Sequence, residues 1–148
     1  MELLPQTPWT RVRTVLNWIN LSTPLGLLVA RLGGATIERR GRGTYLATGY
    51  RHGFPVASAF TIGSVITSRH DRAYLASRPV LLQHEDRHCT QYAFCLGVLM
   101  LPLYFASVAV SWVVAGDHSS FNPFERLANL SDGGYPPART RRARRASR

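Results

Sequence analysis

The sequence predicts an α+β fold in which a small antiparallel β-sheet of about three strands packs on a helix with the pattern His-Glu-x-x-His, with an antiparallel apolar helix and N-terminal helices. Three observations support this: helical spacing of apolar residues near the N-terminus, a glycine-punctuated stretch rich in Thr, Tyr, Ile and Val, and a long apolar segment after the motif. The 148 residues, 45% of them apolar, suffice for one domain with a core. We expect that domain over residues 1–135, and a disordered Arg-rich tail over residues 136–148.

Residues 1–34 are expected to form two N-terminal helices. Four apolar residues of the first helix share one stripe, with polar residues mostly off it: Val12, Val15, Leu16 and Ile19. Pro24 suits the first position of a second helix, which continues to Leu32 and ends at Gly33. We expect both helices to pack their apolar residues in the core.

Residues 35–70 are expected to hold the strands. Three runs have β-type composition between turn residues: 35–39, 44–51 and 59–68. Residues 41–43 suit a hairpin tip. Gly63 inside the third run indicates a bulge, a bend or a close approach of another backbone segment.

The motif lies on a helix that begins at Pro79, within a helical region over residues 79–130. On this helix His84 and His88 are one turn apart on one face, so they can hold one metal ion from the same side, which is typical of zinc. Glu85 is rotated by about 100° from His84 and is therefore placed to act on a water at the metal rather than to bind the metal. Gln91 shares the face of the histidines and is expected to hold a ligand in place.

The segment from Leu96 to Gly116 is long and apolar enough for a membrane span. Pro102 disfavours a helical conformation at the preceding residue and suits a helix start. We therefore expect a break over residues 97–101 and a second helix over residues 102–115, antiparallel to the motif helix. Core packing and membrane contact both fit this composition, and a helix pair resting in the membrane interface is a third option.

A catalytic zinc ion usually takes three protein ligands, so the two histidines need a partner. Six other residues have suitable side chains: His52, His70, Asp71, Asp117, His118 and Glu125. An antiparallel arm of about 21 Å would bring residue 116 back level with His88, and Glu125 on a short helix started by Asn122 and Pro123 could then reach the metal. A complete membrane span would leave about ten residues to cover roughly 30 Å, so it nearly excludes a Glu125 ligand. The alternative role of Glu125 is that of a first-turn acid favoured by the helix dipole.

The pentad HEDRH, with Glu125 37 residues beyond His88, resembles the gluzincin arrangement of zinc metallopeptidases, in which a downstream helix supplies a glutamate. More closely, the runs LLQHEDRHCTQYAFCLG, LPLYFASVAVSW and NPFER resemble a group of short bacterial proteins with the pattern HExxHxxQ, an apolar segment and NPFE. The resemblance covers approximately residues 44–135. It implies a minimal metallopeptidase-like domain with zinc ligands at the positions of His84, His88 and Glu125 and a general base at Glu85, and it implies no particular substrate.

The chain departs from the gluzincin pattern in two ways. Its downstream acid stands in NPFER rather than in the usual gluzincin signature. No residue matches the tyrosine or histidine that stabilises the transition state, although four are available: Tyr45, Tyr50, His70 and His118.

The net charge of +10 does not by itself indicate nucleic-acid binding. Six of the 18 basic residues stand in the last ten positions, and without them twelve basic residues face eight acidic ones. A solvated, disordered tail explains this pattern, although contact with acidic lipid or nucleic acid is an alternative. Cys89 and Cys95 point about 120° apart on one helix, which excludes a disulfide between them and fits a cytoplasmic location, with peripheral contact at the inner face of the membrane as an option.

Three functions remain open at this point. The first is a zinc-dependent hydrolase acting on a peptide or protein substrate. The second is a non-catalytic metal-binding or membrane-associated accessory protein that docks to a membrane surface or to a protein partner. The third, a nucleic-acid binder, rests on the tail alone and is disfavoured.

Overall fold

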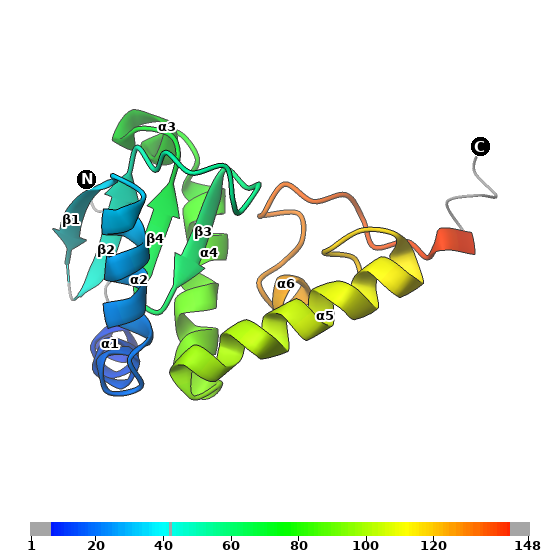
Figure 1. The fold of residues 1–148 in the computed structure, drawn as a ribbon, viewed down its shortest axis with the longest axis horizontal. Coiled ribbons are helices and arrows are strands. Elements are labelled where there is room, and N and C mark those ends of the chain that lie inside the picture. Colours follow the sequence, from blue (N-terminus) through cyan, green and yellow to red (C-terminus); the bar gives the residue numbers. More distant parts are fainter. Residues whose placement is uncertain (1–6, 42, 143–148) are drawn as a thin grey trace.

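The computed structural model describes residues 7–41 and 43–142, and within them it contains six α-helices and a four-stranded sheet. The predicted α+β class is confirmed. Helix α2 (Ser22–Leu32) and helix α4 (Pro79–Phe94) lie on either side of the sheet, and α1 (Pro8–Ile19) packs on both of them (Figure 1).

The sheet has the strand order β1-β2-β4-β3. Its strands are β1 (Thr36–Arg40), β2 (Thr44–Thr48), β3 (Ala59–Ile62) and β4 (Val65–Ser68). The β1–β2 and β3–β4 pairs are antiparallel hairpins, whereas β2 and β4 pair in parallel, with Tyr45 opposite Val65. The expectation of three antiparallel strands was therefore wrong in strand number and in one pairing.

Gly63 explains why the third run is two strands rather than one. Its φ of +63° places it in the left-handed region, where it turns the chain from β3 into β4. A Cβ atom there would lie 2.4 Å from the Ser22 carbonyl carbon, so the start of α2 approaches this backbone closely, as the sequence indicated. In the predicted hairpin tip at residues 41–43, Arg42 lies outside the described residues.

Alternate residues of the sheet face two separate cores, as expected for strands covered on both faces. Leu46 and Ile66 pack with Leu82 and Cys89 of α4. Ala47 and Val65 point to the opposite face and pack with Ala30 and Leu27 of α2. Helix α4 is thus anchored on the sheet by its apolar face, which fixes the position of the motif.

The two N-terminal helices form where predicted, but the apolar stripe of α1 is not in the core. Val15 and Ile19 are 57% and 73% exposed, whereas the buried residues of this helix are polar: Thr10, Arg13, Thr14 and Asn17. The reason is that the polar face meets polar partners on α4. Arg13 forms an ion pair with Asp86, and the Asn17 amide donates to the Cys89 carbonyl at 2.9 Å.

After α4 the chain breaks where expected, but the following helix runs in an unexpected direction. Leu96 and Gly97 have φ of +54° and +72°, the short 3-10 helix η1 (Gly97–Leu99) follows, and α5 (Met100–Ala115) begins. A Cβ atom at Gly97 would lie 2.3 Å from the Asn20 side chain, so this turn is wedged against the link between α1 and α2. Helix α5 consequently leaves the end of α4 and points away from the sheet instead of returning antiparallel along α4 (Figure 1).

Residues 117–127 bring the chain back from the end of α5 towards α4. The Phe121 amide donates to the Ser111 hydroxyl at 2.9 Å, which holds this segment on α5. Asn122 accepts a hydrogen bond from the Phe124 amide and caps α6 (Pro123–Leu127), as predicted. In the predicted tail, Arg141 donates to the Trp112 carbonyl at 2.7 Å, and residues 143–148 lie outside the described residues.

Candidate metal centre

The two motif histidines lie on the same face of α4, where the one-turn spacing places them. Both side chains are buried. Their Nε2 atoms are 3.1 Å apart, and the two rings are nearly perpendicular, with an interplanar angle of 84°. The pair therefore presents two nitrogen atoms to one point inside the protein.

Glu125 reaches the same point from α6. Its Oε2 atom lies 3.1 Å from His84 Nε2 and 3.7 Å from His88 Nε2, and the residue is buried. The three ligand atoms lie within 4.8 Å of one another. The group His84, His88 and Glu125 could therefore hold a metal ion.

Hydrogen bonds fix the proton on the other nitrogen of each imidazole. His84 Nδ1 lies 3.1 Å from the carbonyl oxygens of Ala128 and Asn129, which can only accept, so Nδ1 carries the hydrogen. His88 Nδ1 lies 2.8 Å from Gln91 Oε1. The Gln91 amide nitrogen donates to the Phe124 carbonyl at 2.8 Å, which orients the amide so that its oxygen faces His88. In the neutral form of each imidazole, Nε2 is therefore the nitrogen with the lone pair, and both Nε2 atoms face the carboxylate.

This donor set fits a cation. Among the described residues, Glu125 Oε2 is a buried oxygen that accepts no hydrogen bond, although it faces both histidines. The other oxygen, Oε1, accepts from the Tyr104 hydroxyl of α5. Two imidazole nitrogens and one carboxylate oxygen are therefore available to hold a metal ion.

Glu85 is hydrogen-bonded to the sheet and lies near the ligand triad. The Thr61 hydroxyl of β3 donates to Glu85 Oε2 at 2.8 Å and also lies 3.2 Å from the Glu85 carbonyl oxygen. The side chain is buried in protein but lines a cleft of about 620 Å³. The cleft is bordered by residues 56–59, by the start of α4 and by residues 131–135.

The environments of the two glutamates shift their acidity in opposite directions. Burial raises the pKa of Glu85, and the nearby His88 and His84 oppose this shift only in part. Burial also works to raise the pKa of Glu125, but the contacts with His84 and His88 and the hydrogen bond from Tyr104 outweigh it and lower the pKa. Glu125 is thus held as a carboxylate, and Glu85 is the more readily protonated acid. Burial works to lower the pKa of His88, but Glu125, Glu85 and Gln91 together outweigh it, so the pKa is raised.

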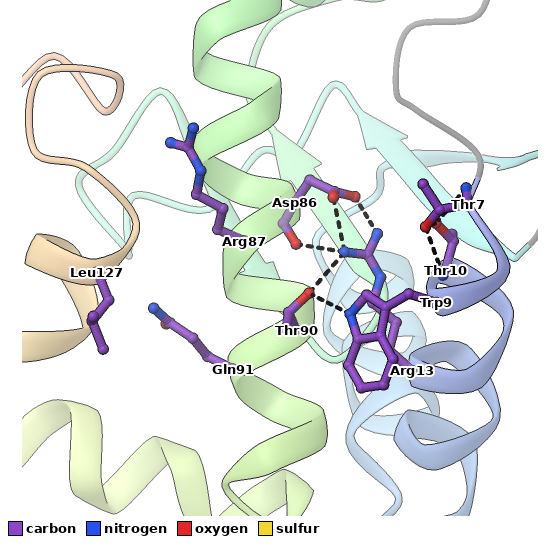
Figure 2. A pocket seen from close by; sticks show the side chains of 9 residues that line it. All are labelled: Thr7, Trp9, Thr10, Arg13, Asp86, Arg87, Thr90, Gln91 and Leu127. Atoms are coloured by element: carbon purple, nitrogen blue, oxygen red, sulfur yellow. Dashed lines mark hydrogen bonds and ion pairs between the residues drawn. The ribbon is translucent and has the colours of Figure 1, made fainter.

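A second hollow, of about 310 Å³, lies on another side of α4 and contains none of the three ligands (Figure 2). The Arg13 guanidinium crosses from α1 to Asp86 and Thr90 on one side of it, while Gln91 and Leu127 lie on the other. The larger cleft also contains none of the three ligands, but Glu85 lines it, and on that ground we associate the candidate site with the larger cleft.

The other sequence candidates for the third ligand lie away from the triad or have other partners. His52 contacts the Leu32 carbonyl, His70 stacks on Tyr74, and Asp71 caps α3 (Arg72–Ala76). Asp117 accepts hydrogen bonds from the Ser119 and Ser120 amides. His118 lines the cleft and packs on Tyr135.

Three residues near the ligands or Glu85 were not predicted from the sequence: Thr61, Tyr104 and Tyr135. Tyr135 packs on His84, with ring centroids 5.9 Å apart. The approach depends on Gly133, where a Cβ atom would lie 2.9 Å from His84 Nε2. The Gly133-Gly134 pair before a tyrosine was the only local indication of this contact. Tyr45 and Tyr50, which the sequence offered instead, pack on Trp18 and on Phe60.

The ligand triad is a feature of the structure, whereas the likeness to gluzincins has no further support. No protein-family model, no curated protein and no solved structure gives a significant match to this chain.

Proposed function

We propose that this protein is a zinc-dependent hydrolase that cleaves peptide bonds, with Glu85 as the general base. The observation that carries the proposal is the convergence of three buried ligand atoms next to an acid that lines a cleft. Two histidines and one glutamate favour zinc among the biological metals, because imidazole suits it and the set leaves a fourth position free.

When bound, zinc would supply a Lewis acid that polarises a carbonyl group and acidifies water. Glu85 would take the proton of the attacking water and pass it to the amine nitrogen, so that the C–N bond breaks after the C–O bond has formed. Thr61 holds one oxygen of this carboxylate and leaves Oε1 for the proton. Burial, followed by the charges of Glu125 and Glu85, raises the pKa of Tyr135, so its hydroxyl stays protonated and can donate to a developing oxyanion.

An extended peptide is the substrate shape that the cleft favours. Strand β3 is an edge of the sheet, and Ala59 of this strand lines the cleft beside Glu85. A peptide could pair with the open edge of β3 and present a carbonyl group to the site. The neighbouring strand β4 cannot do this, because it lies inside the sheet between β2 and β3.

Substitution Glu85→Gln tests the catalytic assignment. The amide cannot accept the water proton, so we expect cleavage of a fluorogenic peptide library to fall by about 10²- to 10⁴-fold. Glu85 is not a ligand in this proposal, so the zinc content should remain at the wild-type value. Both quantities are measured on the same preparation, by fluorescence and by elemental analysis.

Glu38→Gln is the matched control, because Glu38 lies on β1 and is paired with Arg40 outside the site. It should leave cleavage unchanged. Equal activity of Glu85→Gln and wild type would contradict the role of Glu85.

A non-catalytic, metal-binding accessory protein is the second candidate function. The observation that favours it is the exposure of apolar residues over α1 and α5, which suits docking more than catalysis. Stoichiometric zinc without cleavage of any library peptide by the wild type would support this alternative over the hydrolase.

A further inference from the structure

Helix α1 buries its polar residues and exposes its apolar ones, which is the reverse of the arrangement expected for a helix in water. Its apolar residues Val12, Val15 and Ile19 are exposed, while its buried residues are polar and bonded inside the protein. Thr14 donates to the Thr10 carbonyl at 2.7 Å, and Asn17 donates to Ser64 and to the Cys89 carbonyl. Such a helix places its apolar side towards its surroundings, as helices do in lipid.

Helix α5 is apolar on nearly all sides but buries only a narrow face. Among its exposed residues are six large apolar ones: Leu103, Phe105, Val110, Trp112, Val113 and Val114. Residues 97–115 are long and apolar enough to cross a membrane. Yet only 17% of an 18-residue stretch within them is buried in the protein. A helix that is apolar all round needs apolar surroundings.

The polar side chains of α5 do not need water. Tyr104 donates to Glu125, and Ser111 accepts from the Phe121 amide. Ser107 donates to the Leu103 carbonyl of its own helix at 2.9 Å. Hydrogen bonds of this kind satisfy hydroxyl groups in the apolar part of a membrane.

The two apolar segments meet at one end of the molecule. No Asp, Glu, Lys or Arg occurs over residues 14–30 or over residues 88–116. Gly97 is wedged against Asn20, and Phe94 stacks on Trp9 with ring centroids 5.5 Å apart. Ile19, Leu21 and Leu96 are exposed around this junction. In Figure 1 the bend between α1 and α2, the turn after α4 and the start of α5 lie along the lower side.

We propose that the bend between α1 and α2, the η1 turn and the outer side of α5 embed in the apolar layer of a lipid membrane. The exposed arginines Arg11 and Arg31, near the two ends of the charge-free segment 14–30, suit anionic headgroups, and the half-exposed Trp18 and Trp112 suit the interface. Glu125, only ten residues after α5, lies beside His84, so the protein enters the membrane from one side. This inference does not rest on the proposed hydrolase activity.

Flotation with lipid vesicles tests the inference. The full chain is purified in mild detergent and mixed with vesicles of phosphatidylcholine and phosphatidylglycerol, and the detergent is removed. Flotation is then measured in high salt, which screens attraction between the arginines and the headgroups but leaves apolar insertion intact. We expect the wild type to float, and bromine-labelled lipid tails to quench its tryptophan fluorescence.

The double variant Ile19→Glu/Val113→Glu places one acid on each apolar segment. We expect its vesicle partition coefficient to fall by at least about tenfold, because a carboxylate is costly in the apolar layer. Val80→Glu is the matched control: Val80 is also half-exposed but lies about 21 Å along α4 from Phe94. It should float like the wild type.

Three outcomes would overturn the inference. One is a wild type that stays in the aqueous fraction without tryptophan quenching. Another is equal flotation of the double variant. The third is a stable detergent-free oligomer that does not bind vesicles, which would assign the apolar surface to a protein contact. The quenching measurement needs only the wild type, so poor folding of a variant does not prevent the test.

Discussion

The side-chain amide of Gln91 links His88 to the backbone beside Glu125. Its oxygen faces His88 Nδ1, and its nitrogen donates to the Phe124 carbonyl next to Glu125. We expect Gln91→Ala to lower zinc affinity by about 10- to 100-fold, because loss of a hydrogen bond that orients a ligand has effects of this size. Titration against a competing chelator measures the change.

Gln83→Ala is the control for this substitution, since Gln83 lies on the same helix and is exposed. It should leave the affinity unchanged. An identical affinity for Gln91→Ala and Gln83→Ala would show that the amide does not orient the site.

Several residues of the site follow from local sequence, and others depend on the fold. Helical spacing alone places His84 and His88 on one face and turns Glu85 away from them. Glu125 was selected by chain length and by its cap, although the path assumed for α5 was wrong. Tyr104, Thr61 and Tyr135 reach the site from distant elements, and no spacing in the sequence encodes those contacts.

An ion pair between the buried Arg13 and the partly buried Asp86 holds α1 on α4, and this sets the position of the motif helix against the N-terminal helices. Arg13 donates to both carboxylate oxygens of Asp86 and to Thr90. We expect Arg13→Met to lower the free energy of unfolding by about 3–5 kcal/mol, because it leaves Asp86 without its partner. Denaturant unfolding measures this change.

Arg11→Met provides the comparison, because Arg11 is exposed on the same helix. It should change the free energy of unfolding by less than about 0.5 kcal/mol. The double variant Arg13→Met/Asp86→Leu should be more stable than Arg13→Met alone, since no charge is left unpaired. Equal stability of Arg11→Met and Arg13→Met would contradict a stabilising role for the pair.

For the helices, the local sequence determines where a helix begins and ends, but not which face it buries. Caps and prolines located α2, α4 and α6 to within a few residues, because these signals act over short distances in the chain. The face that α1 buries was predicted incorrectly, since the apolar stripe was assigned to the core on the assumption that water surrounds the molecule. Its buried face is instead set by Arg13 and Asn17, whose partners on α4, Asp86 and Cys89, lie more than 70 residues away in the sequence.

At the scale of the whole molecule, the fold brings the candidate metal centre next to an apolar surface. Tyr104 belongs to α5 and bonds Glu125, so the helix that we place in lipid also touches a ligand. The parallel pairing of β2 with β4 could not be predicted, because strand order depends on packing between segments that local composition does not describe. The class of the fold followed from composition, whereas its topology did not.

The most direct test of the central claim is the zinc content of the purified full chain. Elemental analysis should give one zinc ion per chain for the wild type, and His84→Ala and Glu125→Ala should each lose most of it, because each removes one of three ligands. His70→Ala, outside the triad, should retain the wild-type content. A wild type without stoichiometric metal after supply of zinc, or a Glu125→Ala variant that keeps its zinc, would contradict the assignment of this site.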